Sequence, residues 1–310
     1  MPSGVHQAKV PESPRTHVPR PSVTMGPMGT AYANSLLDLD LAFGPRRLRP
    51  LTVIAGPCVL EDDETNLRIG TAMRDACRAL GFAYVFKASF DKANRSSASS
   101  PRGPGLERGC DMIAALRERL GVPSTTDIHE PHQAARAAQA VDILQIPAFL
   151  CRQTDLLLAA AETGRAVNVK KGQFMAPGEM RNAVAKVREG GARHIMLTER
   201  GTFFGYHRLV NDFPGLQDMA DLGVPVCFDV THSTQLPGAE GAMTGGRPDR
   251  AALLARAAVA AGVDAVFLEC HPEPARAFSD KATCQPLASM PKLLEELARI
   301  RAAVVDAYTS

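Results

Sequence analysis

Short apolar runs alternate with longer segments of helical period from Leu51 to the C-terminus. The spacing of the amphipathic segments, such as 106–120 and 249–262, is typical of helices, and several of them end at a glycine just before the next apolar run. The apolar runs themselves predict eight strands, at residues 51–56, 82–88, 122–127, 142–147, 166–171, 194–199, 224–230 and 265–270. Eight strand–helix units predict an α/β protein with a single (β/α)8 TIM barrel.

A doubly wound open sheet is the alternative fold. Its first strand is commonly followed by a glycine-rich turn, GxGxxG, that approaches the phosphates of a dinucleotide. The corresponding stretch here reads AGPCVLE (55–61) and contains no such turn. This difference favours the barrel.

The first 30 residues differ from the rest of the chain. They are rich in proline, serine and charged residues and have no period, so we predict a disordered N-terminal arm at 1–30 and a barrel domain at 31–310. Within 31–50, the alternation in SLLDLDLAF suits a short strand or hairpin. The glycine-rich stretch 237–246 lacks the GK[ST] ending of a P-loop, and we expect a flexible loop over one end of the barrel.

Composition and charge exclude several classes of protein. A net charge of +2 over 310 residues gives no general attraction for nucleic acid or for an anionic membrane. No apolar run approaches the roughly 20 residues of a membrane span, and the N-terminus has no apolar signal core. The seven cysteines are odd in number and scattered, as reduced thiols are. We therefore expect a cytoplasmic protein without nucleic-acid or membrane partners.

Basic residues gather at the predicted strand ends. In a barrel, the carboxyl ends of the strands share one mouth, where active sites lie. Lys87, Lys92, Lys170 and Arg200 come from the second, fifth and sixth strand ends. Four cations that converge without matching acids repel one another unless a polyanion binds, so we predict an anion site. The alternative is that each side chain reaches solvent separately.

A second group of strand-end residues has the chemistry of a metal site. Cys58, His232, Glu269 and Asp280 offer a thiolate, an imidazole and two carboxylates, which suit Zn²⁺, Fe²⁺ or Mn²⁺ better than Mg²⁺ or Ca²⁺. No local motif such as CxxC or HExxH links them, and a buried thiol or a solvated carboxylate is the alternative for each. Three other strand-end residues could orient a ligand or make structural hydrogen bonds, namely His129, Asp229 and His271.

Motifs in this order along residues 51–290 resemble the 3-deoxy-D-manno-octulosonate 8-phosphate synthase (KDO 8-phosphate synthase) family. They include AGPCVLE (55–61), FKASFDKANRSS (86–97), TDIHEP (126–131), LQIPAFLCRQTDLL (144–157), NVKKGQF (168–174), ERGTFFGY (199–206), FDVTHSTQLPG (228–238) and SDKATCQPL (279–287). KANRSS separates this family from the related DAHP synthases, which carry KPRTS at that place.

The resemblance implies a transferase reaction. Phosphoenolpyruvate would condense with D-arabinose 5-phosphate and water to give KDO 8-phosphate and inorganic phosphate, an early step of lipopolysaccharide biosynthesis. The family also implies a homotetramer. Because its metal-independent members carry Asn where Cys58 stands, the resemblance implies the metal-dependent class, with a divalent ion held by Cys58, His232, Glu269 and Asp280.

The resemblance further implies roles for individual residues. The phosphoenolpyruvate carboxylate would be held by Lys87, Ser89 and Lys92, and its phosphate by Gln145, the Ala148 backbone, Lys170 and Arg200. The pentose hydroxyls would face Asn94 and Asp127, and Arg95 with Ser96 would reach the pentose phosphate of a neighbouring subunit. The implied catalytic residues are Lys92, Asn94, Asp127 and His232.

Three departures from the family pattern bear on substrate preference and metal binding. Gly172 stands where proline is common, His207 with Arg208 replaces a more usual Asn-Asn, and Lys281 follows Asp280 where glycine is common. The alternative functions are a related condensing enzyme of the DAHP synthase type that uses another aldose, and a non-catalytic barrel that senses a sugar phosphate.

Overall fold

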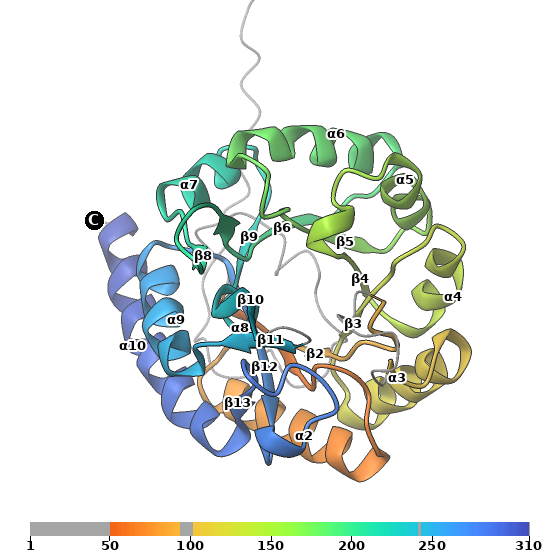
Figure 1. The fold of residues 1–310 in the computed structure, drawn as a ribbon, viewed down its shortest axis with the longest axis horizontal. Coiled ribbons are helices and arrows are strands. Elements are labelled where there is room, and N and C mark those ends of the chain that lie inside the picture. The colour runs from red at the N-terminus through yellow and green to blue at the C-terminus, as the bar shows by residue number, and fades with distance from the viewer. Residues whose placement is uncertain (1–49, 94–101, 241–242, 310) are drawn as a thin grey trace, which may run out of the picture. The chain divides into compact units, whose positions relative to one another are not determined.

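The computed structural model describes residues 50–93, 102–240 and 243–309. Within them, eight parallel strands close into a ring, because β1 pairs with β2 on one side and with β12 on the other (Figure 1). The ring consists of β1 (Thr52–Gly56), β2 (Ala83–Lys87), β3 (Ser124–Asp127), β4 (Ile143–Ile146), β5 (Ala166–Lys170), β6 (Ile195–Glu199), β9 (Val226–Asp229) and β12 (Ala265–His271). The predicted barrel and its eight strands are confirmed, and the open sheet is wrong.

Helices surround the ring (Figure 1). They are α2 (Asp63–Ala79), α3 (Leu106–Leu120), α4 (Gln133–Ala140), α5 (Thr154–Glu162), α6 (Arg181–Glu189), α7 (Pro214–Ala220), α9 (Ala251–Ala260) and α10 (Met290–Thr309), with the single turn α8 (Val230–Ser233). Local sequence sets their ends: the Asp62 side chain accepts a hydrogen bond from the Thr65 amide at the start of α2, and α3 ends at Gly121 in the left-handed conformation.

Short 3-10 turns complete the connections. They are η2 (Ala148–Leu150), η3 (Pro177–Met180), η4 (Pro248–Arg250), η5 (Pro274–Arg276) and η6 (Leu287–Ser289), and the two-residue strand β13 (Gln285–Pro286) pairs with the end of β12. η2 follows β4 directly and η5 follows β12 closely, so both belong to loops at the carboxyl end of the ring. These loops border the mouth of the barrel.

The alternation along the strands separates two packed regions. Alternate residues of each strand point outward and pack against the helices. Among the inward-pointing residues, a small apolar cluster fills part of the ring. The inner cluster contains Ile54, Val85, Ile143, Ala166, Met196, Cys227, Ala265 and Phe267. Two residues beyond six members of this cluster, the inward positions are polar or charged, namely Lys87, Gln145, Asn168, Thr198, Asp229 and Glu269. The interior of the barrel is therefore apolar toward the amino ends of the strands and polar at the mouth, where the strands end.

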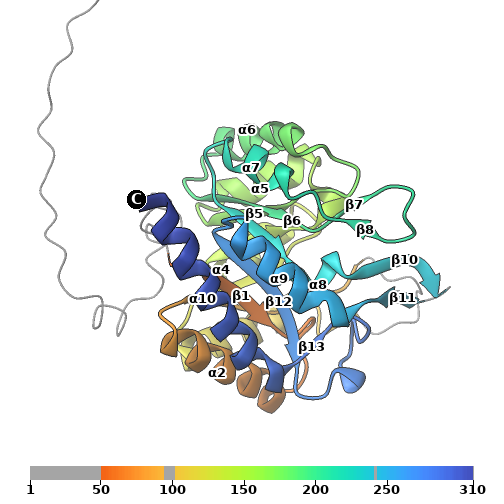
Figure 2. The ribbon, with the colours of Figure 1, turned by 90° about the vertical axis from the view of Figure 1, so that its left-hand side faces the viewer.

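Two antiparallel hairpins lie on the same side of the barrel (Figure 2). One is β7 (Thr202–Phe203) with β8 (Leu209–Val210), and the other is β10 (Gln235–Glu240) with β11 (Met243–Gly246). The expectation of a loop at 237–246 is wrong, because glycine forms backbone ladder hydrogen bonds as well as any other residue. Gln235 pairs with Gly246 and Leu236 with Gly245.

Two sequence-based expectations fall outside the described residues, namely the arm at 1–30 and most of the short strand or hairpin at 31–50. Among the helices of the described chain, none is both long and apolar enough to cross a membrane.

The close approach of β1 to β2 leads to the first prediction. A Cβ atom on Gly56 would lie 1.9 Å from the carbonyl oxygen of Lys87, which is backbone and cannot turn away. We expect Gly56→Ala to destabilise the barrel by about 3 kcal/mol or more, which corresponds to a fall of roughly 5 °C or more in the melting temperature. Gly178→Ala is the control, because a Cβ there meets nothing within 4 Å. Equal melting temperatures for the two variants would contradict this packing.

Candidate active site

Charged residues line the inner wall of the mouth, and most of them are paired. Glu269, at the end of β12, is fully buried, and its Oε1 atom lies 2.6 Å from Lys87 Nζ and 3.9 Å from Lys92 Nζ. Its Oε2 atom is buried and has no hydrogen-bond partner among the described residues. Burial would raise the pKa of Glu269, but the charges of Lys87, His232 and Lys92 outweigh it and hold that pKa well below its usual range.

Asp229, at the end of β9, holds a second cation. Its Oδ2 atom accepts hydrogen bonds from Lys170 Nζ at 2.7 Å and from His232 Nδ1 at 2.8 Å. Its Oδ1 atom accepts the His232 amide at 2.9 Å, which caps the turn α8. Burial would raise the pKa of Asp229, yet His232 and Lys170 lower it, so the carboxylate stays ionised. Lys170 Nζ also lies 3.8 Å from the ring centre of Phe267.

The expected convergence of cations without matching acids is therefore wrong for the buried lysines. Lys87 pairs with Glu269 and Lys170 pairs with Asp229, each in a site with almost no solvent exposure. Lone charges cannot be buried at acceptable cost, so the fold supplies a carboxylate from a strand distant in the sequence. What converges at the mouth is a set of oriented cations whose charge is already compensated.

Arg200 follows β6 and is buried at the same mouth. Its Nη2 atom donates to Gln235 Oε1 at 2.5 Å, whereas its Nη1 atom is buried and has no hydrogen-bond partner within the described part of the chain. Burial lowers the pKa of this guanidinium, which stays charged because arginine begins so far above neutrality. The Nη1 atom of Arg200 is thus available to donate a hydrogen bond to a bound anion.

Asp127, at the end of β3, is the centre of a polar network. Its two oxygens accept hydrogen bonds from Ser89 Oγ at 2.7 Å and from Gln145 Nε2 at 2.5 Å. The network continues through Asn168 Nδ2, which donates to Gln145 Oε1 at 3.1 Å, and Thr198 Oγ1, which donates to Asn168 at 2.7 Å. Burial would raise the pKa of Asp127, but nearby lysines, Lys87 above all, lower it. Asp127 is therefore an ionised acceptor.

Three of the predicted metal ligands lie together. Ligand atoms of Cys58, Glu269 and Asp280 are all within 4.8 Å of one another. Cys58 Sγ donates to Asp280 Oδ2 at 2.8 Å, and burial, together with Asp280 and Glu269, raises the pKa of the thiol well above its usual value. His232 Nε2 lies 3.8 Å from Glu269 Oε1, so it points toward this cluster without belonging to it.

These residues fit a divalent metal of the first transition series. A thiolate with two carboxylates and a nearby imidazole is a soft and borderline donor set, suited to such ions. The unpartnered Oε2 atom of Glu269 is a buried acceptor that a cation would satisfy. Asp229 holds His232 Nδ1, which leaves Nε2 as the atom that faces the cluster.

The remaining predicted residues fall in several places. His271 Nε2 lies 3.3 Å from Glu61 Oε2, and His129 packs edge-on against Phe90, so both belong to the surroundings of the mouth. Lys281 is exposed beside Asp280, which adopts a left-handed backbone with φ of 50°. Asn94, Arg95 and Ser96 lie outside the described residues.

Sequence reasoning missed several partners at the mouth. Asn168 and Thr198 sit on inward positions of β5 and β6, and a polar residue inside an otherwise apolar strand was the available signal for both. Gln235, which accepts a hydrogen bond from Arg200, carries no local signal of this contact, because it lies 35 residues away in the sequence. Contact between distant strand ends depends on closure of the ring.

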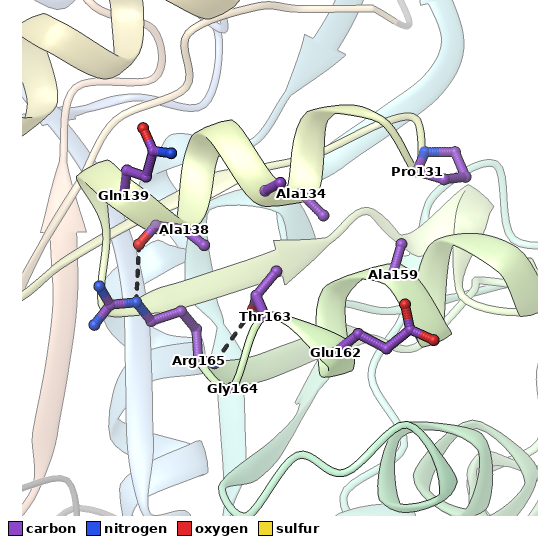
Figure 3. A pocket seen from close by; sticks show the side chains of 10 residues that line it. Pro131, Ala134, Ala138, Gln139, Ala159, Glu162, Thr163, Gly164 and Arg165 are labelled. Atoms are coloured by element: carbon purple, nitrogen blue, oxygen red, sulfur yellow. Dashed lines mark hydrogen bonds between the residues drawn. The ribbon is translucent and has the colours of Figure 1, made fainter.

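A groove of about 680 Å³ lies elsewhere, on the outer surface between α4 and α5 (Figure 3). Small side chains such as Ala134, Ala138 and Ala159 line it, and Arg165 Nε donates to the Ala138 carbonyl at 2.8 Å. It contains none of the paired charges of the mouth. The mouth is therefore the better candidate for catalysis.

Comparisons with known proteins agree with this geometry. The DAHP synthetase I family matches residues 47–304. A 2-dehydro-3-deoxyphosphooctonate aldolase of Nitratidesulfovibrio vulgaris is 56% identical over 248 residues, which cover 80% of this chain and 91% of that protein. Proteins with the same name from Methylobacterium radiotolerans and Cyanothece sp. are 56% identical over 250 residues and 51% identical over 265 residues, which cover 80% and 86% of this chain and 88% and 96% of theirs. The chain belongs to the DAHP synthetase I family, among the relatives that are KDO 8-phosphate synthases.

Proposed function

We propose that this chain condenses phosphoenolpyruvate with D-arabinose 5-phosphate and water to give KDO 8-phosphate and inorganic phosphate. The observation that carries the proposal is the set of buried, compensated cations around one mouth, with a donor edge of Arg200 left for an anion. The printed name of the relatives, 2-dehydro-3-deoxyphosphooctonate aldolase, supports the same chemistry. The enzyme is a transferase of the lipopolysaccharide pathway.

Phosphoenolpyruvate binds through its two anionic ends. Lys87, Ser89 and Lys92 take the carboxylate, and the phosphate is taken by Gln145, the Ala148 backbone, Lys170 and Arg200. Lys87 and Lys170 are held in place by Glu269 and Asp229, so little reorganisation is needed when the substrate arrives.

The pentose lies against the polar network of the inner wall. Asp127 is ionised and central to that network, and it faces the sugar hydroxyls together with Asn94. Arg95 and Ser96 reach the pentose phosphate of a neighbouring subunit. This arrangement holds C3 of phosphoenolpyruvate near the aldehyde carbon, which a weak nucleophile requires.

Charge develops in two places as the C–C bond forms. The aldehyde oxygen becomes more negative and C2 acquires cationic character, after which water adds at C2 and phosphate leaves by C–O cleavage. Lys92 Nζ and His232 Nε2 lie 3.9 and 3.8 Å from Oε1 of Glu269, and we assign to them the transfer of a proton to the aldehyde oxygen or from the water. Fixed cations stabilise the departing phosphate.

Cys58, His232, Glu269 and Asp280 would hold a divalent ion, Zn²⁺, Fe²⁺ or Mn²⁺. Such an ion, when bound, polarises the aldehyde oxygen or orients a water molecule. The chain's own contribution is to aim the donors: Asp229 fixes the His232 ring, and the left-handed backbone at Asp280 turns its carboxylate toward Cys58.

The enzyme acts in the cytoplasm as a homotetramer. Large aromatic side chains are exposed on loops at the carboxyl ends of β4, β5 and β6, namely Phe149, Phe174, Phe203, Phe204 and Tyr206. Exposed apolar clusters of this kind favour protein contacts. A neighbouring subunit packed there would bring its own residues to the mouth.

The first functional prediction concerns the aldose. We expect phosphate release from phosphoenolpyruvate with arabinose 5-phosphate, and at least about 100-fold lower kcat/KM with erythrose 4-phosphate, because a site built for a longer polyol leaves polar groups unpaired with the shorter one. The measurement is inorganic phosphate released per minute with each sugar and with none. Preference for erythrose 4-phosphate would instead indicate the DAHP synthase type, and binding of phosphoenolpyruvate without turnover would indicate a sensor.

The second functional prediction concerns Cys58. We expect Cys58→Ala to weaken binding of Zn²⁺ or Mn²⁺ on the order of 100-fold or more, because it removes the thiolate ligand. Metal content after dialysis, measured by elemental analysis, checks this without an activity assay. Cys77→Ala is the matched control, since Cys77 is equally buried but lies on α2 away from the mouth. Full metal content in Cys58→Ala would remove this residue from the site.

A further prediction concerns the assembly of subunits. Light scattering coupled to size exclusion should give about four times the mass of one chain at neutral pH. Phe204→Asp places a charge on an aromatic side chain that is 76% exposed, and it should shift the protein to a smaller species without lowering its melting temperature. A wild-type chain that stays monomeric at micromolar concentration would refute the tetramer.

A further inference from the structure

A buried ion pair lies just behind the phosphate side of the mouth. Lys171 follows β5, Glu199 ends β6, and both side chains are fully buried. Lys171 Nζ lies 3.4 Å from Glu199 Oε2. Strand alternation places Glu199 on the opposite face of β6 from Thr198, which points into the polar network. The pair therefore lies behind the inner wall of the barrel and does not line the mouth.

The pair joins the loop after β5 to the loop after β6, which begins the β7–β8 hairpin. Lys171 Nζ donates to the carbonyl oxygens of Gly172 at 3.4 Å and Met175 at 3.2 Å, and to Thr202 Oγ1 at 3.1 Å. One ammonium group thus touches both the loop after β5 and the loop after β6. A backbone hydrogen bond from the Phe203 amide to the Gln173 carbonyl, 3.0 Å long, adds to the same junction.

Glu199 fixes the start of the second loop. Its Oε1 atom accepts the amides of Arg200 at 3.0 Å and Gly201 at 2.6 Å. Gly201 has φ of 97°, and a Cβ there would lie 2.8 Å from Leu209 Cβ, so the turn is tightly confined. The direction in which Arg200 leaves the strand therefore depends on the Glu199 carboxylate.

The loop after β5 packs against another of the proposed phosphate ligands, the backbone of Ala148. A Cβ on Gly172 would lie 3.1 Å from the Ala148 carbonyl oxygen, so the backbones of these two residues are packed against each other. A displacement of residues 172–175 would therefore also shift the backbone of Ala148, which packs against Gly172. Lys171 and Glu199 thus stand behind both Arg200 and Ala148.

We infer that Lys171 and Glu199 are positioning residues that set the geometry of the phosphate subsite for phosphoenolpyruvate, although neither of them touches the substrate. The inference rests on the proposed function for the identity of the substrate. The pair carries no net charge, so its action on the phosphate comes from geometry and little from its field. Removing both charges together should therefore spare folding and still impair the binding of phosphate.

The experiment compares three variants of the full-length protein. Lys171→Met and Glu199→Gln each leave one buried partner unpaired, so both should lower the melting temperature. The double variant removes both charges at nearly constant shape and should melt within a few degrees of the wild type. In that stable double variant we expect KM for phosphoenolpyruvate to rise about tenfold, with KM for arabinose 5-phosphate changed less than twofold.

Inorganic phosphate and pyruvate are probes that separate the two ends of the substrate. The inhibition constant of inorganic phosphate should rise by about the same tenfold factor, while that of pyruvate, which lacks the phosphate, stays within twofold. Binding of inorganic phosphate can also be measured by calorimetry without turnover. The inference therefore remains testable if the wild-type chain shows no condensation with the pentose, an outcome that would refute the proposed function alone.

A matched control comes from the amino end of the barrel. Arg117 and Asp142 form a bidentate ion pair with hydrogen bonds of 2.8 and 2.7 Å, distant from the strand ends of the mouth. The double variant Arg117→Met with Asp142→Asn should leave both KM values and the phosphate inhibition constant unchanged.

Unchanged phosphate binding in the folded Lys171→Met, Glu199→Gln variant would overturn the inference. An equal loss of affinity for phosphate and for pyruvate would also overturn it, because the role would then be general stability. If the double variant does not fold, Thr202→Val removes a single partner of Lys171 and should raise the phosphate inhibition constant about threefold. An unchanged phosphate inhibition constant in Thr202→Val would likewise contradict the inference.

Discussion

The mouth of this barrel depends on the pairing of buried charges. Lys87 with Glu269 and Lys170 with Asp229 are almost completely shielded from water, where an uncompensated ion would cost several kcal/mol. Each pair joins strands that are far apart in the sequence and separated by a single strand in the ring. The same pairing that makes burial tolerable also fixes the ammonium groups, so the cations are oriented before any anion arrives.

Closure of the sheet sets where those pairs can form. β1 joins β12, so Glu269 comes to lie across from Lys87, and the alternation of each strand directs apolar residues into the lower interior and polar ones to the mouth. Phe267 marks the boundary, because its ring lies below Lys170 at 3.8 Å and below Lys87 at 5.4 Å. The apolar floor excludes water from the pairs and strengthens their electrostatic interaction.

The sequence contains the periodicity of all eight strands, and the residues at their ends could be identified from that periodicity alone. Their pairing could not, since Lys87 and Glu269 are 182 residues apart and no local pattern relates them. For this reason the cations were expected without matching acids. The hairpin at 235–246 escaped detection for a different cause: side-chain patterning is the signal for strands, and a glycine-rich strand pairs through its backbone. Within the KANRSS motif, which points to the pentose, residues 94–97 lie outside the described residues.

Glu269 stands between two functions that the sequence presented as separate. Its Oε1 atom faces Lys87 and Lys92 on the side proposed for phosphoenolpyruvate, and its Oε2 atom is unpartnered within the described residues and belongs to the proposed metal cluster. Loss of this carboxylate would leave Lys87 buried without its counter-ion and would remove a metal donor at the same time. Cys58, by contrast, contributes its Sγ atom to the cluster alone, through its contact with Asp280. The metal site can therefore be separated from substrate binding at the thiol but not at the carboxylate that the two share.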